Sequence, residues 1–436
     1  LRRLELLMCD NRDAIVAALD ADFGRRPAEE TDLLEIFPSL SAVRHARRHV
    51  RRWMRVRRRW ANLLFLPART EIVPQPRGVI GIIAPWNYPL YLAMGPLADA
   101  LAAGNRAMVK MSEYTPRFSA LFADLVARAF RSDEVSVVTG DAEIGRTFSA
   151  LPFDHLLFTG STAVGRHVMS AAAANLTPVT LELGGKSPAL IGPGARFAHA
   201  VERIVLGKLL NAGQTCIAPD YVLLPRADVS RFVDAARAAA SRLYPDLPRN
   251  AQYSSIVSDR HFARLRALCD DAVALGAHAH VLGSADGDTR SRVMAPVLLT
   301  DVDDRMQIMH EEIFGPLLPL VPYDTLDDAL TYIAARPHPL ALYVFDDDRA
   351  TLERVQRNTL AGGVTVNDTI LHIAQHNLPF GGVGSSGIGV YHGEAGFRTF
   401  SHMRPVMRQA RWNAVGLLNP PYAWKFRQVL KLILRR

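Results

Sequence analysis

One cysteine and one glutamate have the side chains that covalent catalysis requires. Cys216 ends the small-residue segment GQTC, directly before an apolar run, and Glu182 lies within the otherwise apolar segment LELGGK. A lone cysteine is usually a small buried hydrophobe, whereas a carboxylate is costly to bury unless it is paired or used. If the fold brings both side chains to one cleft, the thiol can act as nucleophile and the carboxylate as base.

Asn87 is a third candidate, in the segment PWNYP at the end of an apolar run and before a helical pattern. Its side-chain amide could donate a hydrogen bond to an oxyanion as charge develops on a substrate oxygen. The same residue type at this place is also a common helix N-cap. This fragment alone leaves both interpretations open.

The segment from Gly78 to Gly185 must position these residues, and its short apolar runs alternate with longer helical patterns. The apolar runs are GVIGIIAPW, AMVKMS, SVVTG, HLLFTG and PVTLELGG, and the helical patterns are 89–103, 116–130, 141–151 and 161–176. This alternation predicts βαβ units and a parallel sheet. Ligands of such sheets bind at the carboxyl ends of the strands, where the segments 85–87, 110–113 and 160–161 lie.

The rest of the chain is predicted from length and local pattern. With 436 residues the chain exceeds what one core usually supports, so two or three units are expected. A second α/β region is predicted from Gly185 to about residue 385. Residues 1 to about 60 are predicted to be helical, and 62–77 and 395–406 to be extended.

Charge is concentrated rather than uniform. The net charge is +8, and the segment Arg44–Arg59 alone holds nine arginines and two histidines. A helix is predicted there, with Val43, Val50, Trp53 and Met54 on its apolar face and the arginines on a solvated or subunit-contacting face. We therefore do not expect a nucleic-acid partner.

Cysteine usage and hydropathy bear on the compartment. Three scattered cysteines do not form a disulfide framework, so a reducing compartment, the cytoplasm, is expected. No run of 18 uncharged apolar residues is present, so no integral membrane segment is expected. The basic amphipathic tail 424–436 is predicted to pack on a partner subunit rather than on an anionic membrane.

Seven segments carry a family resemblance that covers nearly the whole chain. They are PWNYP, KMSEYTP, FTGSTAVG, LELGGKSP, GQTC, EEIFGP and LPFGGVGSSGIG. In this order and spacing they resemble the aldehyde dehydrogenase superfamily. GQTCIAPDYVL is most similar to the dimeric aromatic and fatty aldehyde enzymes, while ADFGRR and AQHNLPFGGVG are most similar to bacterial coniferyl aldehyde dehydrogenases.

The resemblance implies an α/β fold with a Rossmann-like parallel-sheet cofactor domain, an α/β catalytic domain and a small oligomerisation element. It also implies a homodimer with contacts around residues 68–76 and after Gly396. The corresponding ranges are 1–61 with 78–184 for the NAD(P)-binding domain, 185–385 for the catalytic domain, and 62–77 with 386–436 for the oligomerisation element and tail.

For catalysis, the resemblance implies that Cys216 is the nucleophile, Glu182 the general base, and Asn87 the oxyanion donor together with the backbone N–H of Cys216. Attack of the thiolate on an aldehyde, transfer of hydride and hydrolysis of a thioester would yield a carboxylic acid. A coenzyme A-acylating enzyme and an inactive structural homologue are the remote alternatives; Glu182 argues against the first, because acylating relatives tend to lack the base.

For the adenosine half of the cofactor, the resemblance implies that Lys110 and Glu113 approach the ribose hydroxyls and that Trp86 lies beside the adenosine and the pyrophosphate. A carboxylate at Glu113 would accept from a 2′-hydroxyl and repel a 2′-phosphate, so NAD is expected, with NADP as the alternative.

For the remaining cofactor groups, Gly160 and Ser161 match the pyrophosphate turn, and Gly165 allows the next helix to close onto the sheet. Glu312 and Phe314 match the pair that positions the nicotinamide ribose and ring.

The candidate substrate residues are Tyr88, Tyr91, Ile217 and His372. Their aromatic and apolar character suits coniferyl aldehyde and its oxidation to ferulate. Medium-chain aliphatic and benzaldehyde-type aldehydes are the alternatives.

Two patterns are predicted not to carry chemistry. Gly382–Gly387 matches G-x-G-x-x-G but has no following βαβ unit, so a turn is predicted. The pairs His45 with His49 and His372 with His376 have helical spacing without an acidic or cysteine partner, so no metal is expected.

Overall fold

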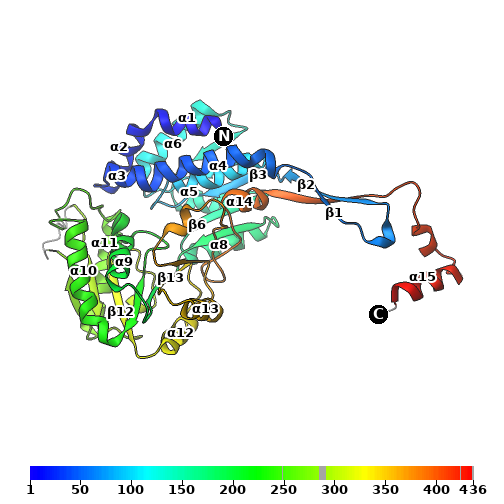
Figure 1. The fold of residues 1–436 in the computed structure, drawn as a ribbon. Coiled ribbons are helices and arrows are strands. Elements are labelled where there is room, and N and C mark those ends of the chain that lie inside the picture. Colours follow the sequence, from blue (N-terminus) through cyan, green and yellow to red (C-terminus); the bar gives the residue numbers. More distant parts are fainter. Residues whose placement is uncertain (248, 284–290, 423, 435–436) are drawn as a thin grey trace.

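Three β-sheets organise the protein in the computed structural model, which describes residues 1–247, 249–283, 291–422 and 424–434. Two sheets form the body, and the third is a narrow arm that extends away from it (Figure 1). The α/β class expected from the alternating pattern is confirmed.

The first sheet contains the predicted βαβ units. Its strands are β3 (Val79–Ile83), β4 (Arg106–Lys110), β5 (Val135–Val138), β6 (His155–Gly160), β7 (Val179–Leu183) and β15 (Gly387–Ile388). The connecting helices are α5 (Tyr91–Ala102), α6 (Pro116–Ala129), α7 (Ala142–Ser149) and α8 (Thr162–Ala173). The order is β15-β7-β6-β3-β4-β5, parallel except for β15. The order therefore reverses between β3 and β6, the place where such sheets bind ligands.

The N-terminal helices pack on α5 and α6, above the first sheet in Figure 1. They are α1 (Arg2–Asp10), α2 (Arg12–Phe23), α3 (Ala28–Thr31), the π-helix η1 (Asp32–Ile36) and α4 (Phe37–Trp53).

The continuous helix predicted through Arg44–Arg59 is wrong at its end. Helix α4 stops at Trp53, and Arg57–Arg59 form the short strand β1 beside β2. Trp53 is fully buried as expected, but Met54 is 58% exposed and is not on the apolar face. The neighbouring strand offers unpaired backbone groups, and pairing with them satisfies the arginine backbone while leaving the guanidinium groups in solvent.

The second sheet confirms the second α/β region. Its strands are β8 (Pro188–Ile191), β9 (Tyr221–Pro225), β10 (His278–Val281), β11 (Val297–Thr300), β12 (Leu317–Tyr323), β13 (Ala341–Phe345) and β14 (Gly363–Val366), in the order β10-β11-β12-β9-β8-β13-β14. Its helices are α9 (Phe197–Leu209), α10 (Val229–Leu243), α11 (Asp259–Ala274), α12 (Leu326–Ala334) and α13 (Arg349–Asn358).

Short 3-10 helices are η2 (Leu63–Phe65), η3 (Leu210–Gly213), η4 (Arg226–Asp228), η5 (Gln307–Met309), η6 (Leu371–Ala374) and η7 (Val415–Leu418).

The arm consists of β1, β2 (Arg69–Pro76) and β16 (Ser401–Arg408), with α15 (Trp424–Leu434) beyond its tip (Figure 1). The extended structure predicted for 395–406 is wrong in its first half, because α14 spans Gly393–Thr399. Gly396 lets this helix approach α5, since a Cβ there would lie 1.9 Å from the Asp99 carboxylate.

The structure bears on the predicted domain ranges and on the predicted C-terminal tail. Strand β15 belongs to the segment assigned to the oligomerisation element, yet it pairs with β7 of the first sheet; the domain boundaries stay a prediction. Residues 435–436 of the predicted tail lie outside the described residues. Across the described ranges, every helix is too short or too polar to cross a bilayer.

Candidate active site

The parallel strands bring the predicted strand-end residues to one edge of the first sheet. Asn87 follows β3, Glu113 follows β4, and Gly160 ends β6. Glu182 lies near the end of β7, directly opposite Thr159 of β6. The sheet register therefore places the candidate base beside the candidate cofactor turn.

Cys216 follows a loop with unusual backbone geometry. Asn211 and Ala212 have φ of 52° and 51°, and Gly213 has φ of 75°. The left-handed region is costly for residues other than glycine and is often found at functional sites. A Cβ on Gly213 would lie 2.4 Å from the carbonyl oxygen of Gly315, so only glycine fits there. The turn is held by its surroundings and presents Cys216 at the start of an apolar segment.

The Cys216 thiol is half-buried. Burial, assisted by the Glu312 and Glu182 carboxylates, raises the pKa of the Cys216 thiol well above its usual range. Backbone N–H groups of Cys216 and Ile217 oppose this rise. The resting sulfur therefore carries its proton, and attack requires loss of that proton.

Glu182 is 2% exposed, and its carboxylate oxygens have no hydrogen-bond partner among the described residues. Burial raises the pKa of Glu182 well above its ordinary value. A carboxyl group with a raised pKa is a stronger base once it is ionised. Because Glu182 contributes to the shift of the Cys216 pKa, the fold brings the two groups within electrostatic range.

Asn87 is 2% exposed, and its side-chain Nδ2 donates to the carbonyl oxygen of Gln214 at 3.1 Å. The helix-cap interpretation is wrong, because α5 begins at Tyr91 and its N-cap is Leu90. An asparagine amide has two N–H donors. One holds the Cys216 loop, which leaves the other for a substrate oxygen.

Lys110 is buried at the end of β4. Its Nζ donates to the carbonyl oxygens of Met111 at 2.7 Å and Gly140 at 2.8 Å, and lies 3.9 Å from the Glu113 carboxylate. Burial lowers the pKa of Lys110, while Glu113 and Asp141 oppose that effect. Glu113 is exposed at the same edge and can accept hydrogen bonds from a ligand.

The turn after β6 has the close packing that a phosphate-binding turn needs. A Cβ on Gly160 would lie 2.5 Å from the Phe158 ring, and one on Gly165 would lie 2.6 Å from Leu183. Ser161 caps α8 and leaves the start of the helix open to solvent. The N–H groups at a helix N-terminus suit an anionic pyrophosphate, so these residues fit the cofactor.

Glu312 and Phe314, which the resemblance assigns to the nicotinamide end, lie where two loops are in close contact. The Glu312 carboxylate lies against Gly184, where a Cβ would be 2.0 Å away, and accepts from the backbone N–H of Gly185. Burial and the Asp220 carboxylate raise the pKa of Glu312 to about 8. Phe314 has φ of 52°, and its ring lies 5.3 Å from that of Trp86, edge to face.

Sequence reasoning missed the charges that support this loop. Lys186 forms an ion pair with Asp220 and also donates to the Ile308 and Glu311 carbonyl oxygens at 2.6 and 2.9 Å. The other Asp220 oxygen accepts from Ile313 N at 3.0 Å. The signal was present, since both charged residues lie inside the motif segments LELGGKSP and GQTCIAPD.

Two of the candidate substrate residues, Tyr88 and Ile217, lie beside Cys216. Tyr88 Oη hydrogen-bonds to Thr215 Oγ1 at 2.5 Å, and Tyr91 Oη donates to the Ile373 carbonyl oxygen at 3.3 Å. Ile217 is fully buried. Tyr88, Tyr91 and Leu92 form an apolar cluster against Leu34 and Ile373.

His372 and His376 are not on one helical face, because η6 ends at Ala374. His372 Nδ1 hydrogen-bonds to Thr365 at 2.9 Å, and His376 Nε2 to Ser41 at 3.0 Å. Within the described part of the chain, no three His, Cys, Asp or Glu side chains are grouped so as to hold a metal.

The G-x-G-x-x-G segment is a turn, as predicted. Gly384 and Gly387 form an isolated bridge around Ser385 and Ser386, and the chain continues into β15.

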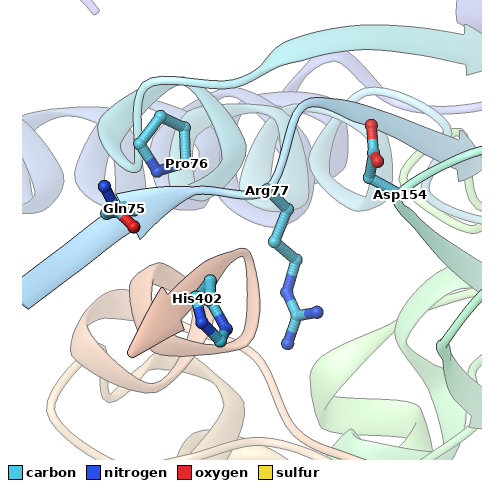
Figure 2. A pocket seen from close by; sticks show the side chains of 5 residues that line it. All are labelled: Gln75, Pro76, Arg77, Asp154 and His402. Carbon is cyan, nitrogen blue, oxygen red and sulfur yellow. The ribbon is translucent and has the colours of Figure 1, made fainter. Parts of the chain in front are cut away.

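The protein also has a surface pocket of about 460 Å³ (Figure 2). It is lined by Gln75, Pro76, Arg77, Asp154 and His402. Arg77 and Asp154 precede β3 and β6, so the pocket lies at the amino ends of the strands. The candidate active site is at the opposite edge.

A dinucleotide-type sheet edge beside a half-buried thiol and a buried acid is the arrangement of an oxidoreductase that works through a covalent cysteine. Residues 1–406 match the Aldehyde dehydrogenase family, and the chain belongs to that family. It is an NAD(P)-dependent enzyme that oxidises aldehydes.

Individual relatives agree over the whole length. A probable coniferyl aldehyde dehydrogenase of Pseudomonas aeruginosa is 50% identical, over 100% of this chain and 91% of that protein. The coniferyl aldehyde dehydrogenase of Pseudomonas sp. strain HR199 is 46% identical, with the same coverage of 100% and 91%. The substrate-bound structure of Staphylococcus aureus AldH is 37% identical, with a TM-score of 0.94 over 99% of this chain and 93% of that one.

Proposed function

We propose that Cys216, Glu182 and Asn87 oxidise a coniferyl-type aromatic aldehyde to its acid, with NAD as the preferred cofactor. The observation that carries the division of roles is the buried Glu182 carboxyl group, which lacks a hydrogen-bond partner among the described residues and lies within electrostatic range of the Cys216 thiol.

Acylation begins with removal of the thiol proton. Solvent water takes it, because the Cys216 side chain is partly exposed, and the Glu182 carboxylate is kept for the later hydrolysis of the thioester. The sulfur then attacks the aldehyde carbon, and the carbonyl oxygen becomes an oxyanion. Asn87 Nδ2 and the backbone N–H of Cys216 stabilise that charge without becoming charged themselves.

The bound nicotinamide cofactor supplies the hydride acceptor. Lys110 and Glu113 would hold its adenosine ribose, Gly160 and Ser161 its pyrophosphate. Glu312 would accept from the nicotinamide ribose, since its Oε1 is buried and lacks a hydrogen bond to any described residue.

Trp86 and Phe314 contribute aromatic surface beside the cofactor, and their edge-to-face contact keeps both rings oriented. Gly165 contributes space, because it allows α8 to lie close to β7.

Deacylation consumes water. The Cys216 thioester is attacked by a water molecule from which Glu182 removes a proton, and the acid leaves as the thiol is restored. The dry surroundings of Glu182 keep its pKa raised, so its carboxylate is a strong base toward the attacking water.

The coniferyl assignment rests on the two coniferyl relatives and on the cluster of Tyr88 and Tyr91, of which Tyr88 hydrogen-bonds to Thr215 beside Cys216. The NAD preference rests on the exposed Glu113 carboxylate at the adenosine end.

A panel of kcat/KM values tests the substrate and the cofactor together. Coniferyl and cinnamyl aldehydes should exceed benzaldehyde and medium-chain aliphatic aldehydes, and NAD should exceed NADP for each. An aliphatic aldehyde with the highest value would overturn the substrate proposal. NADH formation that strictly requires coenzyme A would instead show an acylating enzyme.

We also propose a homodimer. Strand β16 pairs with β2 on one side, and among the described strands nothing pairs with its other side. An open strand edge is a template for pairing with another chain. Light scattering coupled to gel filtration should give twice the mass of one chain, and a single-chain mass would contradict the proposal.

A further inference from the structure

A buried ion pair in the N-terminal helices has no role in the chemistry described so far. Arg26 Nη1 lies 3.2 Å from Glu35 Oε1, and both side chains are fully buried. Burial raises the pKa of Glu35 to about 7, and the Arg26 guanidinium opposes that rise. Such pairs add little to stability, because desolvation offsets their attraction and apolar residues often replace them without loss. The position of the pair therefore calls for another explanation.

Arg26 reaches the candidate oxyanion donor directly. Its Nη1 also donates to the backbone carbonyl oxygen of Asn87 at 3.0 Å. The same oxygen accepts from Asn211 Nδ2 at 3.2 Å. Two buried donors thus fix the backbone of Asn87, whose own amide is directed at the Gln214 carbonyl before Cys216.

Two acids hold the segments on either side. Glu35 Oε2 accepts from Tyr91 N at 2.7 Å, at the start of the helix that follows Asn87. Glu30 Oε1 accepts from Asn211 N at 2.8 Å, in the left-handed loop that precedes Cys216. The segments that carry the oxyanion donor and the nucleophile are therefore tied to the same short stretch of chain.

The local structure of that stretch is also uncommon. Glu35 lies in the π-helix Asp32–Ile36, and π-helical turns occur frequently at functional sites. The Arg26 guanidinium lies 4.6 Å from the Phe23 ring centre and 5.3 Å from that of Tyr88. These two rings and the ion pair leave the guanidinium little freedom to move away from Asn87.

We propose that Arg26, Glu30 and Glu35 are positioning residues that set the placement of the Asn87 amide relative to Cys216. The inference rests on the proposed function, because it requires Asn87 to be the oxyanion donor. A neutral donor stabilises an oxyanion only if it is already in place, and a shift of about 1 Å can cost about 100-fold in rate. The N-terminal helices are thereby part of the catalytic apparatus.

The test variant is Arg26→Met/Glu35→Gln. It removes both charges, and the substituted glutamine side chain keeps an oxygen that accepts from Tyr91 N, so folding should be retained, as measured by Tm. NAD binding, followed by fluorescence titration, should be unchanged. The single-turnover burst of NADH should slow by about 10- to 100-fold. Arg3→Met is the matched control: Arg3 pairs with Glu134 on the surface at 2.9 Å, and its loss should leave the burst rate unchanged.

A double-mutant cycle separates positioning from general weakening. If Arg26 acts through Asn87, adding Arg26→Met/Glu35→Gln to Asn87→Ala should cause no further slowing. A wild-type burst rate in the Arg26 variant, or an equal extra loss in the Asn87→Ala background, would overturn the inference alone. A wild-type burst rate for Asn87→Ala itself would remove the proposed role of Asn87, and the inference with it.

Discussion

The two halves of the candidate site are built differently. Around Cys216, Glu182 and Asn87 the side chains are buried or half-buried, and the loop before the cysteine is left-handed at two residues other than glycine. At the adenosine end, Glu113 and Ser161 are exposed, and Gly160 and Gly165 lie where a Cβ atom would not fit. The chemical half is packed among buried side chains, whereas the adenosine end presents an exposed surface. Damage to the first half should therefore affect rates, and damage to the second should affect binding.

The largest effect is expected for Cys216→Ala. Oxidation should be abolished because no other group can form the thioester, while NAD affinity should stay nearly unchanged because the cofactor surface is separate. Steady-state NADH formation and a fluorescence titration measure the two properties. Residual turnover near that of the wild type would mean that another nucleophile acts.

Glu182→Gln should separate the two chemical steps. The amide cannot accept a proton from water, so a burst of NADH should be followed by stalled turnover. Stopped-flow absorbance with enzyme in excess, and then with substrate in excess, shows both phases. Steady turnover without a burst would refute the assignment of the base.

The pH dependence of kcat should show the effect of the buried surroundings of Glu182. Burial raises the pKa of Glu182, and the base acts only when ionised, so kcat should rise with pH through a value above the ordinary range of a glutamate. The value of kcat should be low below the pKa of Glu182 and high above it. A kcat already at its plateau near pH 5 would contradict the shift.

The smallest effect is expected at the open half. Glu113→Gln removes a negative charge from the adenosine end, which should lower KM for NADP relative to NAD. An interaction of about 1 kcal/mol between charges in water corresponds to about a fivefold change. The ratio of KM values for the two cofactors measures it, with kcat expected to stay the same; a change in kcat alone would place Glu113 elsewhere in the cycle.

The same contrast separates what the sequence could predict from what it could not. The βαβ units and the strand-end placement of Asn87 and Gly160 were predictable, because strand and helix periodicity are local. The strand Arg57–Arg59 was not, because three arginines have no strand pattern and pair only because β2 lies alongside. Glu182 was predictable as well, because a single acid within an apolar run is a local sequence signal.

The contact of Arg26 with Asn87 could not be predicted from a local sequence pattern. It joins residues far apart in the chain, and only the packed structure shows that they meet. A partial signal existed, since Glu30 and Glu35 are acids on buried positions of the N-terminal helices. The motif segments identified the reacting groups but not the residues that hold them in place.

Peptide mass spectrometry of the Glu182→Gln variant, quenched with acid after the NADH burst, identifies the cysteine that carries the acyl group. We expect one acyl group on the peptide that contains Cys216 and none on the exposed Cys9 or the partly buried Cys269. An unmodified Cys216 after a full burst, or an acyl group on either of the other cysteines instead, would contradict it.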